Sequence, residues 1–368
     1  MWNIIQSLGS DIEKMENEKV KAYEEDGLEK GEKEIPVLYQ EADGVMIYTQ
    51  GKDRKEQYEE YKKNHEGEEV PKKVRNVELK LGMTYEGWKE IGSNRYKLIG
   101  KEYVAGFMTG EEMAQITNAN LYSKYNMDSV KIRVLNSDGG SWIQKLKTIK
   151  TFVQADAYHF NEKIKTCIRD EEDVEKMLKL YHKRQYEAMM ALITELKYKY
   201  NGEYDEVKKL ETLEKYCIKR KNQMKRYNED PEVKKKLVGF SKDTGLKYRN
   251  MGCQESNNYS ILTRRMKKRR MSWTKDGAKN IAKVIAFKAS ESTKDKITEI
   301  SFKRLPEELK NYAEKYIQEI ENNIKSIKEN REKKKVSKQY ECKAGTLLGN
   351  EKIRAILDTK PISELIYR

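Results

Sequence analysis

The stretch VKIRVLNSDGG, residues 130–140, decides the expected fold class. It begins as an apolar, β-branched strand and ends in a polar, glycine-containing turn. A helical pattern over residues 110–125 precedes it, and Ser141 can N-cap a further helix after it. The run TFVQA at 151–155 then predicts another short strand. Because both strands follow helices, we expect them to lie parallel in one sheet, joined by crossover connections.

Strand patterns also precede this stretch. Residues 35–50 are rich in β-forming side chains, and Asp43-Gly44 interrupts them, which predicts either a hairpin or one strand with a bulge. Further strands are expected at 74–84 and 95–107, with a charged loop at 51–72. The early segments therefore predict an antiparallel meander, and the whole predicts an α/β layer with a mixed sheet.

The rest of the chain is mostly helical in pattern. Residues 1–33 predict a charged helix, and residues 160–235 keep helical spacing of their apolar positions. A shorter helix is expected at 255–270 and a long amphipathic one at 305–335. The last of these either packs on its own domain, which we favour, or pairs with a partner helix or a second copy.

The charge is uneven along the chain. The 368 residues contain 75 Lys and Arg against 61 Asp and Glu, for a net charge of +14. Residues 1–34 are acidic, with a net charge of −5, so residues 35–368 carry +19. The densest basic run consists of Arg264, Arg265, Lys267, Lys268, Arg269 and Arg270. Such a surface attracts polyanions, nucleic acid above all, although a Lys- and Glu-rich protein with merely solvated helices remains the alternative.

Several classes of protein are excluded by composition. The sequence has no run of about 18 apolar residues, so we expect no membrane-spanning helix. The N-terminus lacks the pattern of a signal peptide. The four cysteines are widely spaced without a C-x-x-C pair, which fits a reducing cytoplasm better than a zinc site or a disulfide framework.

Three acidic residues suggest a site for chemistry. Asp43 and Asp138 each end a predicted strand and precede a glycine, although Asp-Gly is also a common turn pair. Glu255 begins a predicted helix and shares one stripe with Tyr259, Leu262 and Met266. We expect this stripe to face the sheet. The cations of the same helix then fall on its opposite face. The alternative for Glu255 is a simple preference for a helix N-terminus.

Two aspartates from adjacent strands and a helical glutamate would bind hard cations such as Mg²⁺ or Mn²⁺ through oxygen ligands. Two such ions about 3.5–4 Å apart support in-line phosphoryl transfer, in which water or a DNA 3′-hydroxyl attacks. The candidate catalytic and metal-binding residues are therefore Asp43, Asp138 and Glu255.

Four motifs in order resemble a known family. They are EADGV at 41–45, NSDGGSWI at 136–143, DAYHF at 156–160, and the segment from Glu255 through RRMK to MSW at 271–273. Over residues 35–290 the chain is similar to bacterial insertion-sequence transposases of the ISLre-two type, within the wider DDE transposase class. The resemblance implies Asp43, Asp138 and Glu255 as first, second and third catalytic acids. It also implies metal-dependent cleavage and strand transfer of DNA.

The same resemblance implies a ribonuclease-H-like core: a mixed five-stranded sheet flanked by helices, with an all-α insertion. The expected parts are a charged helical leader at 1–34, the first part of the core at 35–160, the helical insertion at 161–245, the end of the core at 246–300, and a helical extension at 301–368. The insertion explains the long gap between Asp138 and Glu255.

Two further residues lie in the motifs. Asp156 is the rival of Asp138 as second acid, and we favour Asp138 because it follows the longer, more apolar strand. His159 either orients a metal ligand or a phosphate, or is a core histidine, which we favour.

Family members carry a longer N-terminal region expected to bind the element's ends, whereas the first strand here begins near residue 35 after an acidic leader. The site-specific DNA-binding part is therefore either missing, as in a truncated or inactive copy, or supplied elsewhere. The expected partners are DNA, as transposon ends and target, and a second copy of the chain, with no membrane; the expected location is cytoplasmic, at the nucleoid. The alternatives are a nuclease of the same fold that does not join strands, or an inactive basic nucleic-acid-binding protein.

Overall fold

The computed structural model describes residues 2–252 apart from 72, 73, 75 and 149, residues 259–268 and 271–293, and the single positions 296, 318 and 322. The chain divides into two units, and Leu8–Lys294 forms the unit that contains the sheet. The other unit, Met1–Ser7 with Asp295–Arg368, lies almost entirely outside the described residues. The amphipathic helix expected at 305–335 therefore falls outside them as well.

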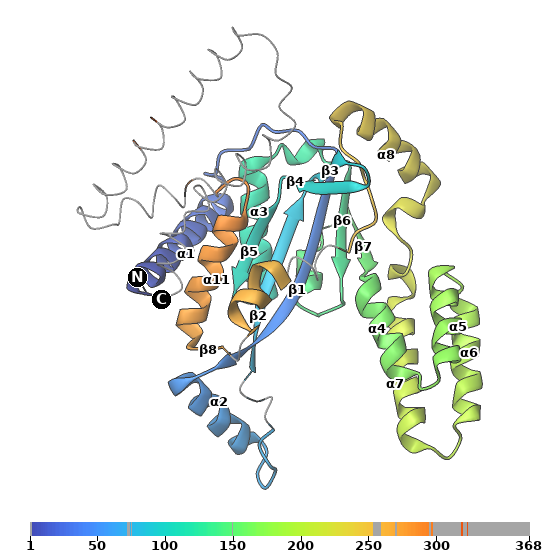
Figure 1. The fold of residues 1–368 in the computed structure, drawn as a ribbon. Helices are drawn as coiled ribbons and strands as arrows, with labels where there is room; N and C mark the ends of the chain where they lie inside the picture. The colour runs from blue at the N-terminus through green and yellow to red at the C-terminus, as the bar shows by residue number, and fades with distance from the viewer. Residues whose placement is uncertain are drawn as a thin grey trace, which may run out of the picture. The chain divides into compact units, whose positions relative to one another are not determined.

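A mixed sheet forms the centre of the larger unit (Figure 1). Its strand order is β5-β2-β1-β6-β7, and β8 pairs with the far end of β1. The strands are β1 (Val37–Thr49), β2 (Asn76–Tyr85), β5 (Glu102–Gly106), β6 (Ile132–Ser137), β7 (Thr151–Ala155) and β8 (Ser272–Trp273). The first three pair antiparallel, whereas β6 and β7 continue the sheet in parallel. This confirms the expected α/β class, and the mixed sheet flanked by helices is consistent with a ribonuclease-H-like layout.

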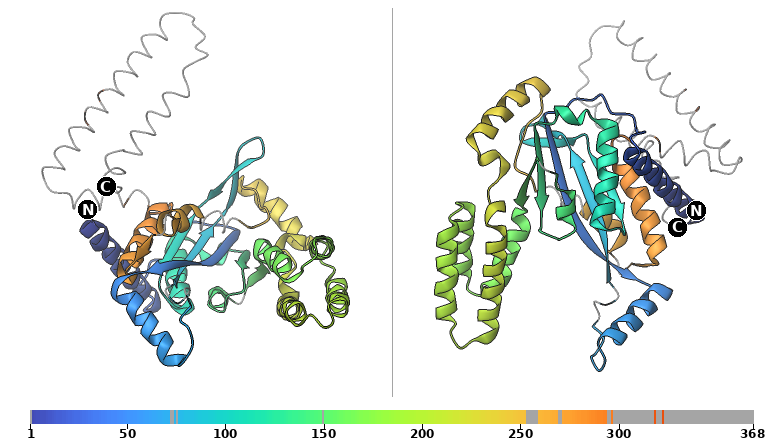
Figure 2. Two further views of the ribbon diagram at one scale, coloured as in Figure 1. Left: turned by 60° about the horizontal axis from the view of Figure 1, so that its bottom comes forward. Right: turned by 180° about the vertical axis from the view of Figure 1, so that it is seen from behind.

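Helices cover both faces of the sheet (Figure 2). On one face, α3 (Gly110–Lys124) packs with Ala42, Leu135 and the short 3₁₀ helix η3 (Ile143–Leu146). On the other, the alanine face of α11 (Lys275–Ala289) packs against the odd-numbered apolar residues of β1. Side chains alternate along a strand, so Asp43 points to this second face. The sheet therefore has two cores, and Asp43 belongs to the α11 side.

The part of the N-terminal helix α1 (Trp2–Glu24) that belongs to the larger unit packs against α11. Two lysines of α11 pair with its glutamates: Lys279 Nζ lies 2.9 Å from Glu13, and the buried Lys283 pairs with Glu16. Gly9 allows the close approach, because a Cβ there would lie only 2.5 Å from Asn280 Cα.

A separate helical lobe follows β7. It consists of α4 (Ala157–Cys167), α5 (Glu171–His182), α6 (Tyr186–Lys199) and α7 (Tyr204–Arg220). The helical lobe has its own core, which includes Phe160, Met177, Ile193 and Leu213. Two 3₁₀ turns, η4 (Lys221–Gln223) and η5 (Tyr227–Glu229), and helix α8 (Pro231–Thr244) lead back to the sheet.

The expectation that Asp43-Gly44 breaks the first strand is wrong. β1 pairs with β2 without interruption from Tyr39 to Tyr48, so the segment is neither a hairpin nor bulged. Gly44 is extended, and a side chain there would overlap the carboxylate of Glu78 on β2. Gly44 is therefore required by the close packing of Glu78 against β1, and it does not form a turn.

Three other local expectations also differ. The segment expected as a loop contains α2 (Gly51–Asn64), a charged helix with no buried residue. The strand expected at 95–107 divides at Gly100, whose φ of +71° ends β4 (Arg95–Ile99); this strand pairs with β3 (Gly87–Gly92) in a second, two-stranded sheet. The helix expected from Ser141 is only the single turn η3, and Trp142 is its N-cap.

The contact at Gly9 generates a test. Replacing Gly9 with Ala should lower the free energy of unfolding by about 1–3 kcal/mol, because the new methyl group meets the backbone of α11. Chemical denaturation followed by circular dichroism measures the change. Gly239→Ala is the matched control, since a methyl group on this glycine of α8 would have nothing within 4 Å and should add up to about 1 kcal/mol of helix propensity. Equal responses of the two variants would contradict the close packing of α1 on α11.

Candidate metal centre

The parallel register of three strands brings acidic residues together. Ala42 of β1 pairs with Ser137 of β6, and Ser137 pairs with Ala155 of β7. The next residue along the chain is an aspartate in each case: Asp43 lies within β1, whereas Asp138 and Asp156 directly follow β6 and β7. The three aspartates therefore lie in one row across the sheet. Asp43 lies far from the other two in sequence, and only the strand pairing makes the three neighbours.

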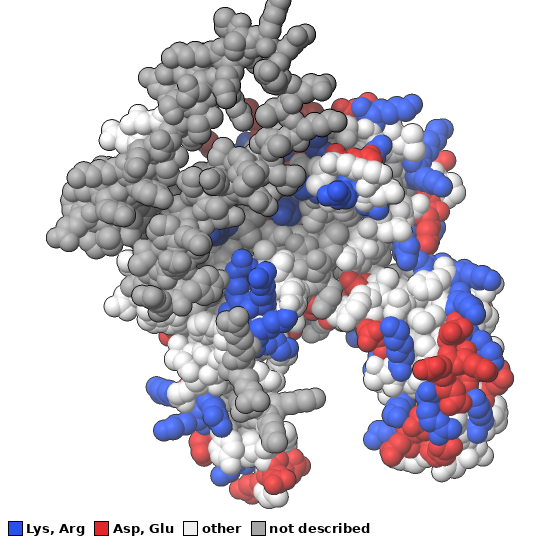
Figure 3. All heavy atoms as spheres, in the orientation of Figure 1, with Lys and Arg blue, Asp and Glu red and all other residues white. Residues whose placement is uncertain are grey.

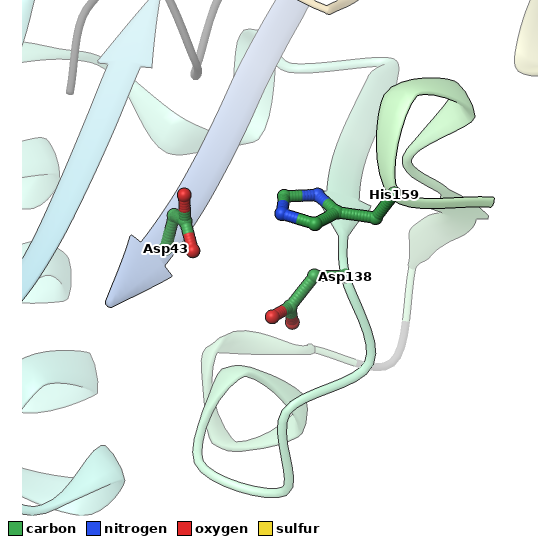
Figure 4. A group of neighbouring side chains, drawn as sticks. All are labelled: Asp43, Asp138 and His159. Carbon is green, nitrogen blue, oxygen red and sulfur yellow. The ribbon is translucent and has the colours of Figure 1, made fainter. Parts of the chain in front are cut away.

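Asp43 and Asp138 form a cluster with His159, which lies in the first turn of α4. Each of the three offers one ligand atom, and these atoms all lie within 4.8 Å of one another. Figure 4 shows the two carboxylates and the imidazole ring extending from three separate segments into one shared space. Two carboxylates and an imidazole at this separation can hold a divalent cation.

Short backbone contacts fix the two carboxylates. Asp43 Oδ1 accepts a hydrogen bond of 2.7 Å from the amide of Gly44, and Asp138 Oδ1 accepts one of 2.7 Å from the amide of Gly140. Gly139 has φ of +92°, a left-handed conformation that favours glycine, and its amide donates to Ser137 Oγ at 2.9 Å. The glycines after Asp138 thus form the tight loop that orients its side chain.

Asp156 lies in the same row, but its oxygens are engaged elsewhere. Oδ1 caps α4 by accepting from the amides of Tyr158 at 2.7 Å and His159 at 3.4 Å. Oδ2 accepts from Asn136 Nδ2 at 2.8 Å. This geometry favours Asp138 over Asp156 as the ligand. Asp156 instead fixes the first turn of α4, which carries His159.

His159 is placed among negative charges. Its Nδ1 lies 3.8 Å from Asp156 Oδ1, too far for a hydrogen bond, and this buried nitrogen has no hydrogen-bond partner among the described residues. Asp156, followed by Asp43 and Asp138, raises the pKa of His159 to about 8 against the opposing effect of partial burial. Burial raises the pKa of Asp156, but His159 and the two α4 amides lower it below its ordinary value. A cation bound here would replace the imidazolium charge and release its proton.

The donor set fits a divalent cation. Carboxylate oxygens suit Mg²⁺ and Mn²⁺, whereas an imidazole nitrogen suits transition metals better than Mg²⁺. The imidazole of His159 and the two adjacent carboxylates match these preferences. Mn²⁺ satisfies both kinds of donor.

A buried polar network supports the site. Glu41, Asn136 and Gln154 point to the same side of the sheet and are at most 5% exposed. Glu41 accepts from Tyr85 Oη at 2.6 Å and from Asn136 at 3.3 Å, and Gln154 donates to Asn136 at 3.2 Å. We did not single out these residues from the sequence, although polar side chains at alternate positions of apolar strands are a recognisable signal.

The third expected acid, Glu255, lies outside the described residues, as do Arg269 and Arg270. The described part of that segment is one π-helical turn, η6 (Tyr259–Thr263), which runs directly into the short helix α10 (Arg264–Met266). The expected inward stripe is correct for Leu262 and Met266, which are buried, and wrong for Tyr259, which is exposed.

The described cations of this segment face solvent. Arg264, Arg265, Lys267 and Lys268 are exposed, and blue side chains gather on the corresponding face in Figure 3. Leu262 and Met266 pack in the core on the α11 side of the sheet, the side to which Asp43 points. The basic cluster, defined as these four residues, therefore stands on the face of the sheet that carries the candidate site.

Fold and site together define an α/β protein with a ribonuclease-H-like layout and a candidate cation site at its parallel strands. The chain belongs to the uncharacterised protein family UPF0236, which matches residues 10–301 and so includes every candidate site residue. No curated protein matches the chain. Among the described residues, no helix is both long and apolar enough to span a membrane.

Metal binding can be tested directly. Isothermal titration with Mn²⁺ should show binding to the parent protein, and Asp43→Asn or Asp138→Asn should weaken it by more than tenfold, because each removes a charged ligand. At a hundredfold excess over its dissociation constant, Mn²⁺ should also stabilise the parent protein by about 2.7 kcal/mol.

Asp276→Asn is the control, because this carboxylate is exposed on α11 and belongs to no such cluster among the described residues. Unchanged Mn²⁺ affinity in both site variants would show that the cluster is not the binding site.

Proposed function

We propose that this chain is the catalytic part of a DDE-type DNA transposase that cleaves and joins DNA by metal-dependent phosphoryl transfer. The observation that carries the proposal is the convergence of Asp43 and Asp138 at neighbouring strands of a ribonuclease-H-like sheet, with His159 beside them. Glu255 is the proposed third acid, on the strength of the sequence resemblance alone.

The reaction needs little from the protein beyond positioning. The oxygen of water or of a DNA 3′-hydroxyl attacks phosphorus, one P–O bond forms and one breaks, and the leaving oxygen takes up a proton. A bound Mg²⁺ or Mn²⁺ supplies charge stabilisation to the phosphoryl oxygens and lowers the pKa of the attacking group. Asp43 and Asp138 hold fixed negative charge where such an ion is required, and their glycine neighbours keep that geometry.

The surface charge supports DNA as the substrate. Residues 35–368 carry a net charge of +19, and phosphate contacts by Lys and Arg supply most sequence-independent affinity for DNA. The basic cluster lies on the α11 side of the sheet with Asp43, so a duplex bound by its backbone there would approach the acidic site.

The activity test uses the full chain with Mn²⁺ or Mg²⁺ and two substrates: supercoiled plasmid carrying the DNA that flanks the coding sequence, and an oligonucleotide duplex with a pre-cut end. We expect cleavage of the first and joining of the second. Asp43→Asn, Asp138→Asn and Glu255→Gln should each lower both rates by about a thousandfold or more, a barrier increase of about 4 kcal/mol.

Asp276→Asn should leave both rates unchanged. Cleavage without joining would instead identify a nuclease of the same fold. DNA binding with no metal-dependent reaction of either substrate would identify an inactive nucleic-acid-binding protein and refute the proposal.

The basic cluster predicts a specific salt dependence. Replacing Arg264, Arg265, Lys267 and Lys268 with Gln should weaken duplex binding and reduce the slope of log affinity against log salt, by up to about 0.9 for each phosphate that these side chains neutralise. Fluorescence anisotropy at several salt concentrations measures both quantities.

The matched control replaces four exposed lysines of α8, Lys234, Lys235, Lys236 and Lys242, with Gln. It removes the same formal charge from a different element and should change the slope less. Equal effects would indicate general attraction to a basic protein rather than binding at the basic cluster.

A further inference from the structure

The last residue of α7, Arg220, reaches from the helical lobe to the candidate metal centre. Its guanidinium donates through Nη2 to the carbonyl oxygen of Asp138 and packs 4.3 Å above the ring of Tyr216. Nη1 lies 3.4 Å from Gln223 Oε1. A residue 82 positions away in sequence thus contacts the backbone of a candidate ligand.

Arg220 is an unusual cation for this lobe. It is only 6% exposed, its Nε is buried without a hydrogen-bond partner, and no carboxylate pairs with it within the described part of the chain. Arg169 and Arg184, in contrast, pair with Glu203 and Glu229. Burying an unpaired charge costs free energy, so simple stability does not account for an arginine here.

The loop after Asp138 is shaped around this arginine. A Cβ at Gly139 would overlap the Arg220 guanidinium, so the two groups are in direct contact. The amides of Gly139 and Gly140 point back to Ser137 Oγ and Asp138 Oδ1. Arg220 therefore binds the loop through the carbonyl oxygen of Asp138, while the amide of Gly140 in the same loop binds the Asp138 carboxylate.

We propose that Arg220 is a positioning residue that fixes the Ser137–Gly140 loop and, through it, the carboxylate of Asp138 for cation binding. The inference rests on the proposed metal site and adds that the helical lobe is a functional part of it. Outer contacts of this kind typically change metal affinity by about 10–100-fold when removed.

The test measures Mn²⁺ affinity of the full chain by isothermal titration. Arg220→Met, which keeps bulk without hydrogen bonds, should raise the dissociation constant by about tenfold, and Arg220→Lys should recover part of the loss because it can still donate to the carbonyl. Gly139→Ala should weaken binding as well, for two reasons: its left-handed backbone is strained by any side chain, and a methyl group there would displace the Arg220 guanidinium.

A second readout needs no metal. In the metal-free protein, Arg220→Met should speed hydrogen exchange of the amides at 139 and 140, which the loop now protects. Arg169→Met is the matched control, because its guanidinium also packs over a tyrosine of the lobe, 4.5 Å from the Tyr200 ring, whereas its hydrogen bonds go to Asp170 and Glu203, away from the loop.

The outcomes separate the two proposals. If Asp43→Asn and Asp138→Asn abolish Mn²⁺ binding while Arg220→Met, folded by circular dichroism, binds as the parent does, the positioning role is refuted and the metal site stands. If Asp43→Asn and Asp138→Asn bind Mn²⁺ as the parent does, the metal site itself is refuted. Should Arg220→Met fail to fold, Arg220→Gln and Arg220→Lys decide the question by the same measurement.

Discussion

The parallel pairing of β1, β6 and β7 is the constraint on which the candidate site depends. One register places Ala42, Ser137 and Ala155 side by side, and the residues that follow them are acidic. A shift of a single residue would turn every side chain of the strand to the opposite face and separate the acids. The apolar residues of β1, which pack against α11 on one side and α3 on the other, hold this register, so the cores on both faces serve the site.

The helical lobe is joined to the site at both of its ends. It begins where Asp156 caps α4, which brings His159 toward the carboxylates, and it ends where Arg220 of α7 contacts the Asp138 loop. The lobe nevertheless has a separate core of its own. Both ends of the lobe thus contact the candidate ligands or residues next to them. A partner that binds elsewhere on the lobe and shifts its helices would therefore also shift these ligands.

Local pattern predicted the strands at 130–135 and 151–155 well, because an apolar, β-branched run followed by a polar turn specifies a buried strand end. The prediction of a break at Asp43 was wrong, because an Asp-Gly pair favours a turn only where no strand pairing opposes it. Here β1 pairs with β2 on one side and with β6 on the other. It also favoured a core role for His159, because no local feature shows that three segments will converge. The position of Glu255 stays a prediction, and α2 was missed because a helix without a buried face has no apolar periodicity.

The contrast between Asp156 and His159 shows how the site selects its donors. Asp156 directly follows β7, as Asp138 directly follows β6, but its two oxygens accept hydrogen bonds from the α4 cap and from Asn136. A saturated carboxylate is a poor ligand, and the helix that it caps supplies a nitrogen donor instead. Exchanging an oxygen for an imidazole nitrogen lowers the negative charge of the described donors and moves their preference from Mg²⁺ toward Mn²⁺. An acid from the segment around Glu255 would restore that charge, so the nature of the bound ion depends on that segment as much as on the sheet.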